Sequence, residues 1–264
     1  EPFHHADWVF IESTYGDRDH RPFSDTVAEF KHIVQRTVRD GGKMFMPTFS
    51  VGRAQVMTML LAAMFRNGEV PRFPVYLDSP MAIEASKITM SHPELFDDEM
   101  KDFLHEGSID EDLSTFHTTR TVDESRQIND VKGPCLIIAG SGMCTGGRIL
   151  HHLKHNLWRP ETHVIFVGYQ AAGTLGRQLV DGARVVRLLG EQIVVRAQIH
   201  TLGGFSAHAG QTDLLDWMGV LAPANPRVAV VHGEPIPRDT LAARITDRFK
   251  LVPIKPERST PIEI

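Results

Sequence analysis

Residues 43–68, KMFMPTFSVGRAQVMTMLLAAMFRNG, place a short apolar segment directly before a longer helix-forming one. Residues 43–50 predict a buried strand, because the run is apolar and too short for a helix. Residues 51–66 predict a helix that ends at Asn67 and Gly68. A strand that leads into a helix is the repeating unit of parallel sheets covered by helices. The stretch therefore predicts an α/β fold.

The same alternation continues on both sides of this stretch. Ser24 is the predicted N-cap of a helix that follows the first strand. Regular alternation of this kind predicts a mainly parallel sheet with helices on both faces. Further strands are predicted at residues 6–14, 73–80, 133–142 and 163–170, and further helices at 24–38, 81–96, 148–156 and 171–180.

Two regions depart from this pattern. Residues 97–130 are polar and poorly periodic, which leaves open a helical excursion or a mobile segment. Residues 184–202 indicate a hairpin of two strands instead of a strand and a helix. The last block predicts a helix over 206–221, a strand over 226–234, a helix over 239–249 and a short terminal strand.

Composition bounds the class of protein. The 264 residues are 42% hydrophobic and 23% charged, so the chain can bury one large core or two modest ones. It has no apolar run near the roughly 20 residues that span a bilayer and no signal-peptide pattern, so we expect a cytoplasmic protein without membrane contact. Its 2 cysteines lack the spacing of a disulfide framework or a zinc site. A net charge of −5 means that nucleic-acid binding would need a local basic cluster.

Glu12, His208 and His232 each follow a predicted strand or hairpin. Ligands of open α/β sheets bind at the carboxyl ends of the strands, so the three side chains form a candidate site. Histidine is the usual nitrogen ligand of zinc and the usual proton carrier near neutral pH. A carboxylate can fix the tautomer of one imidazole while another binds metal. Each residue also has a purely structural alternative, as a turn cap or a hydrogen-bonded imidazole.

Five motifs occur in an order that resembles the β-CASP branch of the metallo-β-lactamase superfamily: FIESTYGDRDH, GSGMCTGGR, GYQAAGTLGRQL, GFSAHAG and VVHGE. The resemblance implies that Glu12 is the motif A acid, His208 the motif B histidine beside the scissile phosphate, and His232 the motif C zinc ligand. It also implies hydrolysis of a phosphodiester bond by two zinc ions that activate a bridging hydroxide.

The superfamily takes most of its zinc ligands from an HxHxDH signature, a further histidine and a bridging aspartate, and none of these occurs in this sequence. We therefore expect the chain to be an inactive fragment of a longer enzyme. Residues 1–16 would end the first lactamase half, 17–200 would be the β-CASP domain, and 201–264 would return to the αββα lactamase domain. That last block would expose apolar surface and self-associate, for example as a homodimer. Many relatives have an aspartate where Gly210 stands, and Asp213 is the possible substitute.

Contacts to RNA or phosphate are predicted in two kinds of segment. The glycine-rich turn before the helix at residue 148 offers backbone amides and a first-turn arginine, although such turns also occur without a ligand. Arginines at helix ends are contacts to the RNA backbone or simply solvated side chains. The residues are Ser141, Gly142, Thr145, Gly146, Gly147, Arg148, Arg53, Arg177 and Ser206.

The leading interpretation is a zinc-dependent ribonuclease that, in its complete form, cuts single-stranded RNA. A catalytically silent RNA-binding or scaffold subunit and a DNA-acting β-CASP nuclease are the alternatives. A small-molecule hydrolase of the same superfamily is disfavoured, because the strand–helix blocks between Glu12 and His208 resemble the insertion that covers the metal cleft.

Overall fold

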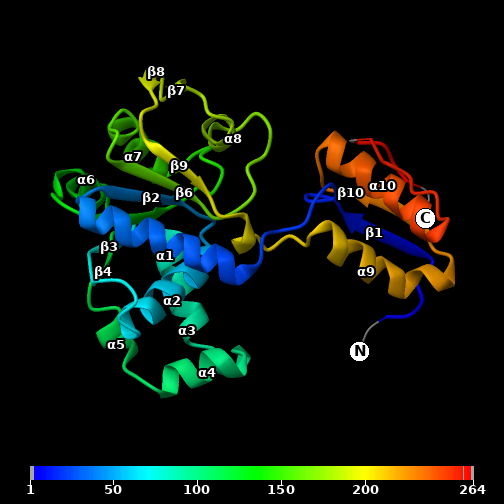
Figure 1. The fold of residues 1–264 in the computed structure, drawn as a ribbon, viewed down its shortest axis with the longest axis horizontal. Coiled ribbons are helices and arrows are strands. Elements are labelled where there is room, and N and C mark those ends of the chain that lie inside the picture. Colours follow the sequence, from blue (N-terminus) through cyan, green and yellow to red (C-terminus); the bar gives the residue numbers. More distant parts are fainter. Residues whose placement is uncertain (1–2, 258, 263–264) are drawn as a thin grey trace. The chain divides into compact units, whose positions relative to one another are not determined.

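The computed structural model describes residues 3–257 and 259–262. The chain divides into two compact units, one from Phe23 to Phe205 and one from the segments on either side of it (Figure 1). These borders lie a few residues after those predicted at 16/17 and 200/201, and the assignment of domains stays a prediction. Residues 1–2, 258 and 263–264 of the predicted outer domains lie outside the described residues.

The Phe23–Phe205 unit is built on a six-stranded parallel sheet in the order β4-β3-β5-β2-β6-β9. The α/β class and the parallel sheet predicted from the sequence are confirmed. The strands are β2 Lys43–Pro47, β3 Val75–Leu77, β4 Phe116–Thr118, β5 Cys135–Ala139, β6 Thr162–Phe166 and β9 Gln198–Thr201. The helices are α1 Phe23–Asp40, α2 Arg53–Arg66, α3 Pro80–Met90, α4 Asp98–His105, α5 Ile109–Asp112, α6 Val122–Gln127, α7 Arg148–Asn156 and α8 Leu175–Val180.

Both faces of the sheet are covered, and the alternation of side chains along β2 shows how. Met44 and Met46 point into a core shared with α1, α2 and α3. Phe45 points into a second core shared with α7 and α8. All three side chains are almost fully buried, which is why the strand is apolar throughout instead of alternating with polar residues. Cys135 and Cys144 are buried in the second core as free thiols.

The segment predicted as one hairpin is a hairpin followed by a further sheet strand. β7 Val185–Leu188 and β8 Glu191–Val194 pair antiparallel, and β9 then joins β6 in parallel. The hairpin prediction was wrong beyond residue 194, because sequence spacing alone does not show which partner a short strand finds. The strand β4 in the polar segment was also missed. The rest of that segment is the helical excursion, α4 to α6.

The second unit contains β1 Trp8–Glu12 and β10 Arg227–Val231, which pair in parallel, with α9 Gln211–Leu221 and α10 Pro235–Phe249. Its core joins Val9 and Ile11 of β1 to apolar residues of β10 and of both helices. The predicted terminal strand is only an isolated bridge between Ala229 and Ile254.

Two further findings concern helices. Ser24 lies inside the first turn of α1 and is therefore not its cap, because Pro22 ends the preceding loop and the helix already begins at Phe23. Within the described part of the chain, no helix is both long enough and apolar enough to traverse a bilayer.

Candidate functional site

Two of the three predicted site residues lie at the carboxyl ends of β1 and β10. Glu12 is the last residue of β1 and lies opposite Val231, the last residue of β10, so that His232 leaves the sheet beside it. His208 reaches the same place from the loop between Phe205 and α9. The sequence placed His208 after the hairpin, and in the structure β9 and a short 3₁₀ turn lie between the hairpin and His208.

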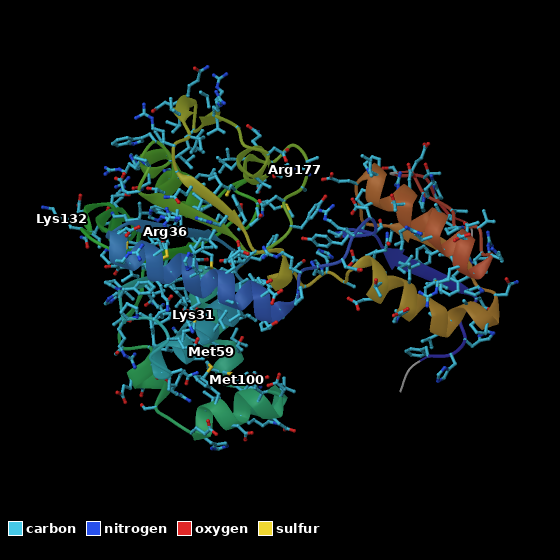
Figure 2. All side chains as sticks on the ribbon, in the orientation of Figure 1. Lys31, Arg36, Met59, Met100, Lys132 and Arg177 are labelled. Atoms are coloured by element: carbon cyan, nitrogen blue, oxygen red, sulfur yellow. The ribbon has the colours of Figure 1, made fainter. Side chains whose placement is uncertain are left out.

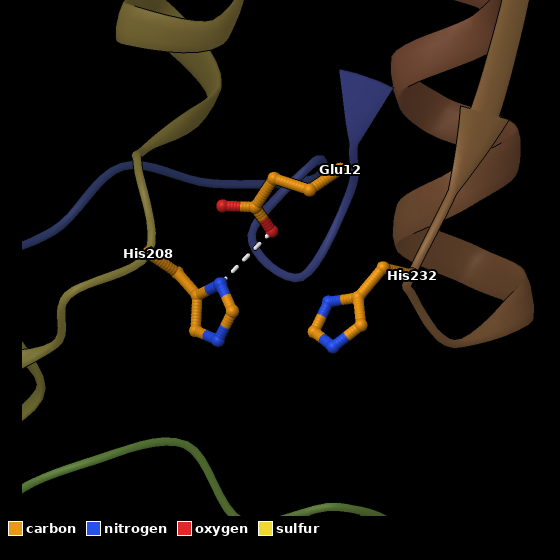
Figure 3. A group of neighbouring side chains, drawn as sticks. All are labelled: Glu12, His208 and His232. Atoms are coloured by element: carbon orange, nitrogen blue, oxygen red, sulfur yellow. Dashed lines mark ion pairs between the residues drawn. The ribbon is translucent and has the colours of Figure 1, made fainter. Parts of the chain in front are cut away.

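Glu12, His208 and His232 converge, with one ligand atom of each within 4.8 Å of the others (Figure 3). The Glu12 Oε2 atom lies 3.1 Å from Nδ1 of His208. The two imidazole rings are stacked, with centroids 5.2 Å apart. The three side chains singled out in the sequence therefore form one cluster, which a turn cap and two unrelated structural histidines would not.

Thr14 connects the two histidines, and sequence reasoning missed it. Its Oγ1 atom lies 3.1 Å from Nδ1 of His232 and 3.3 Å from Nδ1 of His208, and it can donate to the His232 carbonyl at 3.2 Å. Its amide also donates to Glu12 Oε2 at 3.0 Å. The feature of the sequence that could have indicated Thr14 is its position two residues after Glu12, in the ESTYG segment.

One set of imidazole tautomers satisfies all of these contacts together. If Thr14 donates its hydroxyl proton to the His232 carbonyl, its oxygen accepts from His232 Nδ1–H while Glu12 accepts from His208 Nδ1–H. Every donor is then used once. Both Nε2 atoms remain for other partners, and they face the same side of the cluster in Figure 3. An imidazole whose Nδ1–H is held in this way is oriented for binding or proton transfer at Nε2.

The backbone at His232 is shaped to bring the ring to this position. His232 adopts a left-handed φ of 48°, and Gly233 follows against the Ser13 backbone. A Cβ at Gly233 would collide with the Ser13 side chain and carbonyl, so a glycine is required there. Ser13 Oγ donates to the Val231 carbonyl at 2.8 Å and fixes the two strand ends together.

The loop that carries His208 is held at several points. The His208 amide donates to Ser206 Oγ at 3.2 Å, and the Ala209 amide donates to Glu12 Oε1 at 3.2 Å. The His208 carbonyl lies 2.8 Å from His20 Nε2. Asp213 accepts from the Gly210 amide at 3.4 Å, at the start of α9, so it caps the helix in this structure.

Glu12 is set up to remain ionised. Burial raises the pKa of Glu12, but the hydrogen bonds from Thr14 and the charge of a protonated His208 outweigh burial, so the pKa lies below its ordinary value. The carboxylate is therefore an acceptor at neutral pH.

The cluster can supply part of the ligands of a metal centre. His232 is exposed and offers Nε2, in the manner of a zinc-binding histidine whose other nitrogen is held by a hydroxyl. A catalytic zinc takes three protein ligands. This cluster offers two Nε2 atoms, because the Glu12 carboxylate already accepts from His208 and from the Ala209 amide.

A second polar cluster, in the six-stranded unit, was not foreseen from the sequence. Asp78 directly follows β3 and is fully buried. It accepts from Arg148 at 2.7 Å, from Ser125 at 2.6 Å and from Thr119 at 2.5 Å, and lies 2.6 Å from His152 Nε2. Burial raises the pKa of Asp78, but these hydrogen bonds outweigh it and hold the pKa well below its ordinary range. The sequence did contain a feature that could have indicated Asp78, because this carboxylate directly follows a predicted strand, which is where open α/β sheets bind ligands.

The predicted RNA contacts lie in different surroundings. Ser141 to Arg148 form the turn between β5 and α7, and Arg53 begins α2. Arg177 projects from α8 (Figure 2) and pairs with Asp181 at 2.9 Å. Ser206 belongs to the His208 loop. All except Ser206 are part of the Phe23–Phe205 unit.

Two known family models match parts of the chain. Residues 54–179 match the family model of the Beta-Casp domain, and residues 192–256 match that of the Zn-dependent metallo-hydrolase RNA specificity domain. The chain belongs to the β-CASP family of the metallo-β-lactamase superfamily. The second match contains His208 and His232, so both histidines of the cluster lie in the part of this β-CASP chain that matches the RNA specificity domain.

Three curated proteins that are similar to this β-CASP chain are longer than it. Ribonuclease TTHA0252 of Thermus thermophilus is 44% identical over 233 residues, which are 87% of this chain and 52% of that protein. Transcription termination factor FttA of Pyrococcus abyssi is 34% identical over 94% of this chain and 39% of its own length. FttA of Methanocaldococcus jannaschii is 35% identical over 88% of this chain and 38% of its own length. The chain therefore spans about half or less of the length of these relatives.

Proposed function

We propose that this chain supplies the β-CASP domain and the histidine-bearing segment of a zinc-dependent ribonuclease that hydrolyses single-stranded RNA. The observation that carries the proposal is the convergence of Glu12, His208 and His232, with both Nδ1 atoms held and both Nε2 atoms left for other partners. The similar ribonuclease and the matched RNA specificity domain support RNA as the substrate.

The roles follow from the hydrogen bonds. Glu12 stabilises a protonated His208, whose Nε2–H can donate to the leaving oxygen or to a phosphate oxygen that gains charge in the transition state. His232 offers Nε2 as one metal ligand. Zinc, when bound, would supply the activated hydroxide. The remaining ligands would come from residues that are not in this chain.

We further propose that Arg53, Arg177, Ser206 and the glycine-rich turn contact the RNA, the turn through its side chains and not through Arg148, which is paired with Asp78. The net charge of −5 makes such local contacts necessary, because the chain as a whole does not attract a polyanion. A silent RNA-binding subunit and a DNA nuclease remain the competing functions, and the same assay separates them.

The test uses the complete enzyme that contains this chain, with a labelled single-stranded RNA and the DNA of the same sequence as substrates. We expect His208→Ala to slow RNA cleavage at least about 100-fold, the usual contribution of a positioned acid, while the zinc content stays unchanged. We expect His232→Ala to lower the zinc content. His155→Ala, at an exposed position of α7, is the matched control and should leave both quantities unchanged.

Wild-type cleavage by His208→Ala would contradict its role. Binding of RNA without any cleavage by the complete protein would favour the silent subunit. Preferential cleavage of the DNA would favour the DNA nuclease.

A further inference from the structure

The carboxyl ends of β2, β3 and β5 border a pocket of about 410 Å³ in the Phe23–Phe205 unit. This volume is within the usual range of small-ligand pockets, and the place is where open α/β sheets bind ligands. The lining is mainly small or apolar side chains around one buried ion pair. It consists of Ser50, Asp78, Ser79, Pro80, Met81, Gly140, Ser141, Gly147 and Arg148.

The two charged residues of the lining neutralise each other. Arg148 donates to Asp78 at 2.7 Å, and its remaining bonds go to the carbonyls of Thr119 and Arg120 at 3.0 and 2.8 Å. A phosphate in the pocket would have to compete with a buried carboxylate for this guanidinium. The lining therefore favours a neutral group over an anion.

The amides of the glycine-rich turn are also largely engaged. Thr145 and Gly146 donate their N–H groups to Ser141 Oγ at 2.9 and 3.2 Å, and Cys144 donates to the Ser141 carbonyl at 3.1 Å. An anion-binding turn needs such amides to point at the ligand. In this turn they stabilise its own conformation instead.

The aromatic ring of Phe49 is not part of the lining, but it lies beside Gly142, the neighbour of the lining residue Ser141. Phe49 precedes the lining residue Ser50, and a Cβ at Gly142 would lie only 3.0 Å from its Cδ2 and Cε2 atoms. The ring thus rests on the backbone next to Ser141. Phe49 is nevertheless 50% exposed, and Met81 of the lining is 67% exposed. An aromatic ring that is supported on one side and open to solvent is suited to stacking.

Hydroxyl groups complete the lining. Ser50 and Ser79 lie 3.2 Å apart and can each donate or accept. Groups of this kind can meet the edge of any base without selecting one. Stacking on an aromatic side chain is likewise tolerant of sequence, because every base has a π-face.

We propose that this pocket receives one unpaired nucleobase of a single-stranded RNA, stacked on Phe49 with its edge toward the Ser50 and Ser79 hydroxyls. The inference rests on the proposed function, since it takes RNA as the substrate. Arg148 and Asp78 maintain the shape of the pocket and do not contact a phosphate.

The test measures binding of the 264-residue chain to two labelled decamers at one fixed salt concentration by fluorescence anisotropy. One decamer is oligouridylate, and the other has the same ribose-phosphate backbone without bases. We expect Phe49→Leu, which retains bulk and loses the π-face, to weaken binding of oligouridylate about 10-fold. Binding of the abasic decamer should not change.

Two variants accompany this measurement. Phe49→Tyr keeps the ring and should bind oligouridylate as the wild type does. Trp158→Leu removes another ring that is 46% exposed, after the far end of α7, and should also bind as the wild type does. Thermal unfolding of each variant confirms that it is folded. A separate titration with uridine, followed by NMR, tests the pocket without any phosphate.

The outcomes separate the pocket from the proposed function. Equal binding of oligouridylate by Phe49→Leu and wild type would overturn the base pocket and leave RNA binding in place. An equal loss for both decamers would also overturn it, because Phe49 would then act on the backbone or on the fold. If neither decamer binds while uridine binds to the wild type and not to Phe49→Leu, the base pocket is supported and the proposal of RNA as the substrate is contradicted.

Discussion

A single hydroxyl organises the histidine cluster. Thr14 Oγ1 lies beside Nδ1 of both His208 and His232, so its removal should free the His232 ring, while Glu12 still holds the His208 ring. We expect Thr14→Val, which keeps the shape and loses the hydroxyl, to lower RNA cleavage by the complete enzyme about 10-fold to 100-fold, as loss of a group that orients a metal ligand typically does. Cleavage rates and zinc content are the measurements.

The matched control for that change is Thr246→Val in α10, where the hydroxyl only contacts the Ala242 carbonyl of the same helix at 3.0 Å. It should cleave RNA at the wild-type rate. If Thr14→Val also does so, the hydroxyl has no part in orienting the histidines.

Asp78 is the residue on which the second polar cluster depends. Its removal leaves the buried His152 and the Arg148 guanidinium without their shared carboxylate. We expect Asp78→Asn to lower the free energy of unfolding by about 3 kcal/mol, the usual cost of breaking a buried pair. Urea unfolding measures this. Asp123→Asn removes an exposed carboxylate that pairs with Arg126 and should change stability little, and an equal effect of both variants would count against the buried pair.

At the scale of elements, β6 and β9 are joined by a histidine pair. His163 Nδ1 lies 2.9 Å from His200 Nε2, with the rings nearly parallel. Burial, His200 and Arg36 of α1 (labelled in Figure 2) lower the pKa of His163 to about 4, while Asp40 acts in the opposite direction. Burial also lowers the pKa of His200. The fold therefore favours the neutral pair.

A pH dependence follows from this pair. An unfolded histidine has a pKa of about 6.5, so between pH 6.5 and 4 the unfolded chain binds a proton that the folded chain does not. Stability is then lost as the pH falls through this range, by about 3 kcal/mol for His163. Urea unfolding at several pH values should show this loss, and His163→Gln should reduce it. His92→Gln, at an exposed position, should follow the wild-type profile, and an unchanged profile of His163→Gln would refute the assignment.

The elements that the sequence predicted are those with a strong local pattern. The strand at Lys43–Pro47 and the helix at Arg148–Asn156 are found at the predicted residues, because apolar runs and helical periodicity are local properties. β4 and β9 were missed, because a strand of three or four residues is defined by its partner. In the same way Glu12 was recognised by its place at a strand end, whereas Thr14 and Asp78 acquire their roles only from residues that are distant in sequence.

At the scale of the whole molecule, the number of metal ligands limits what the chain does by itself. Among the described residues, one group of side chains is arranged so that it could hold a metal ion, namely Glu12, His208 and His232, and in it the acid and one imidazole contact each other. We expect the 264-residue chain, dialysed against buffer with trace zinc, to retain fewer than two zinc ions per molecule and to leave RNA uncut. Elemental analysis and the cleavage assay measure this.

The ligand assigned to His232 makes that expectation specific. Any zinc that the chain does retain should be lost in His232→Ala and kept in His155→Ala, because only the first removes an Nε2 that faces the cluster. Chelation should leave the unfolding curve unchanged, since the Val9 and Ile11 core packs against β10 and both helices without a metal. Two firmly bound zinc ions in the chain alone would show that it holds zinc ligands beyond this cluster. The proposal that the remaining ligands come from residues outside this chain would then be wrong.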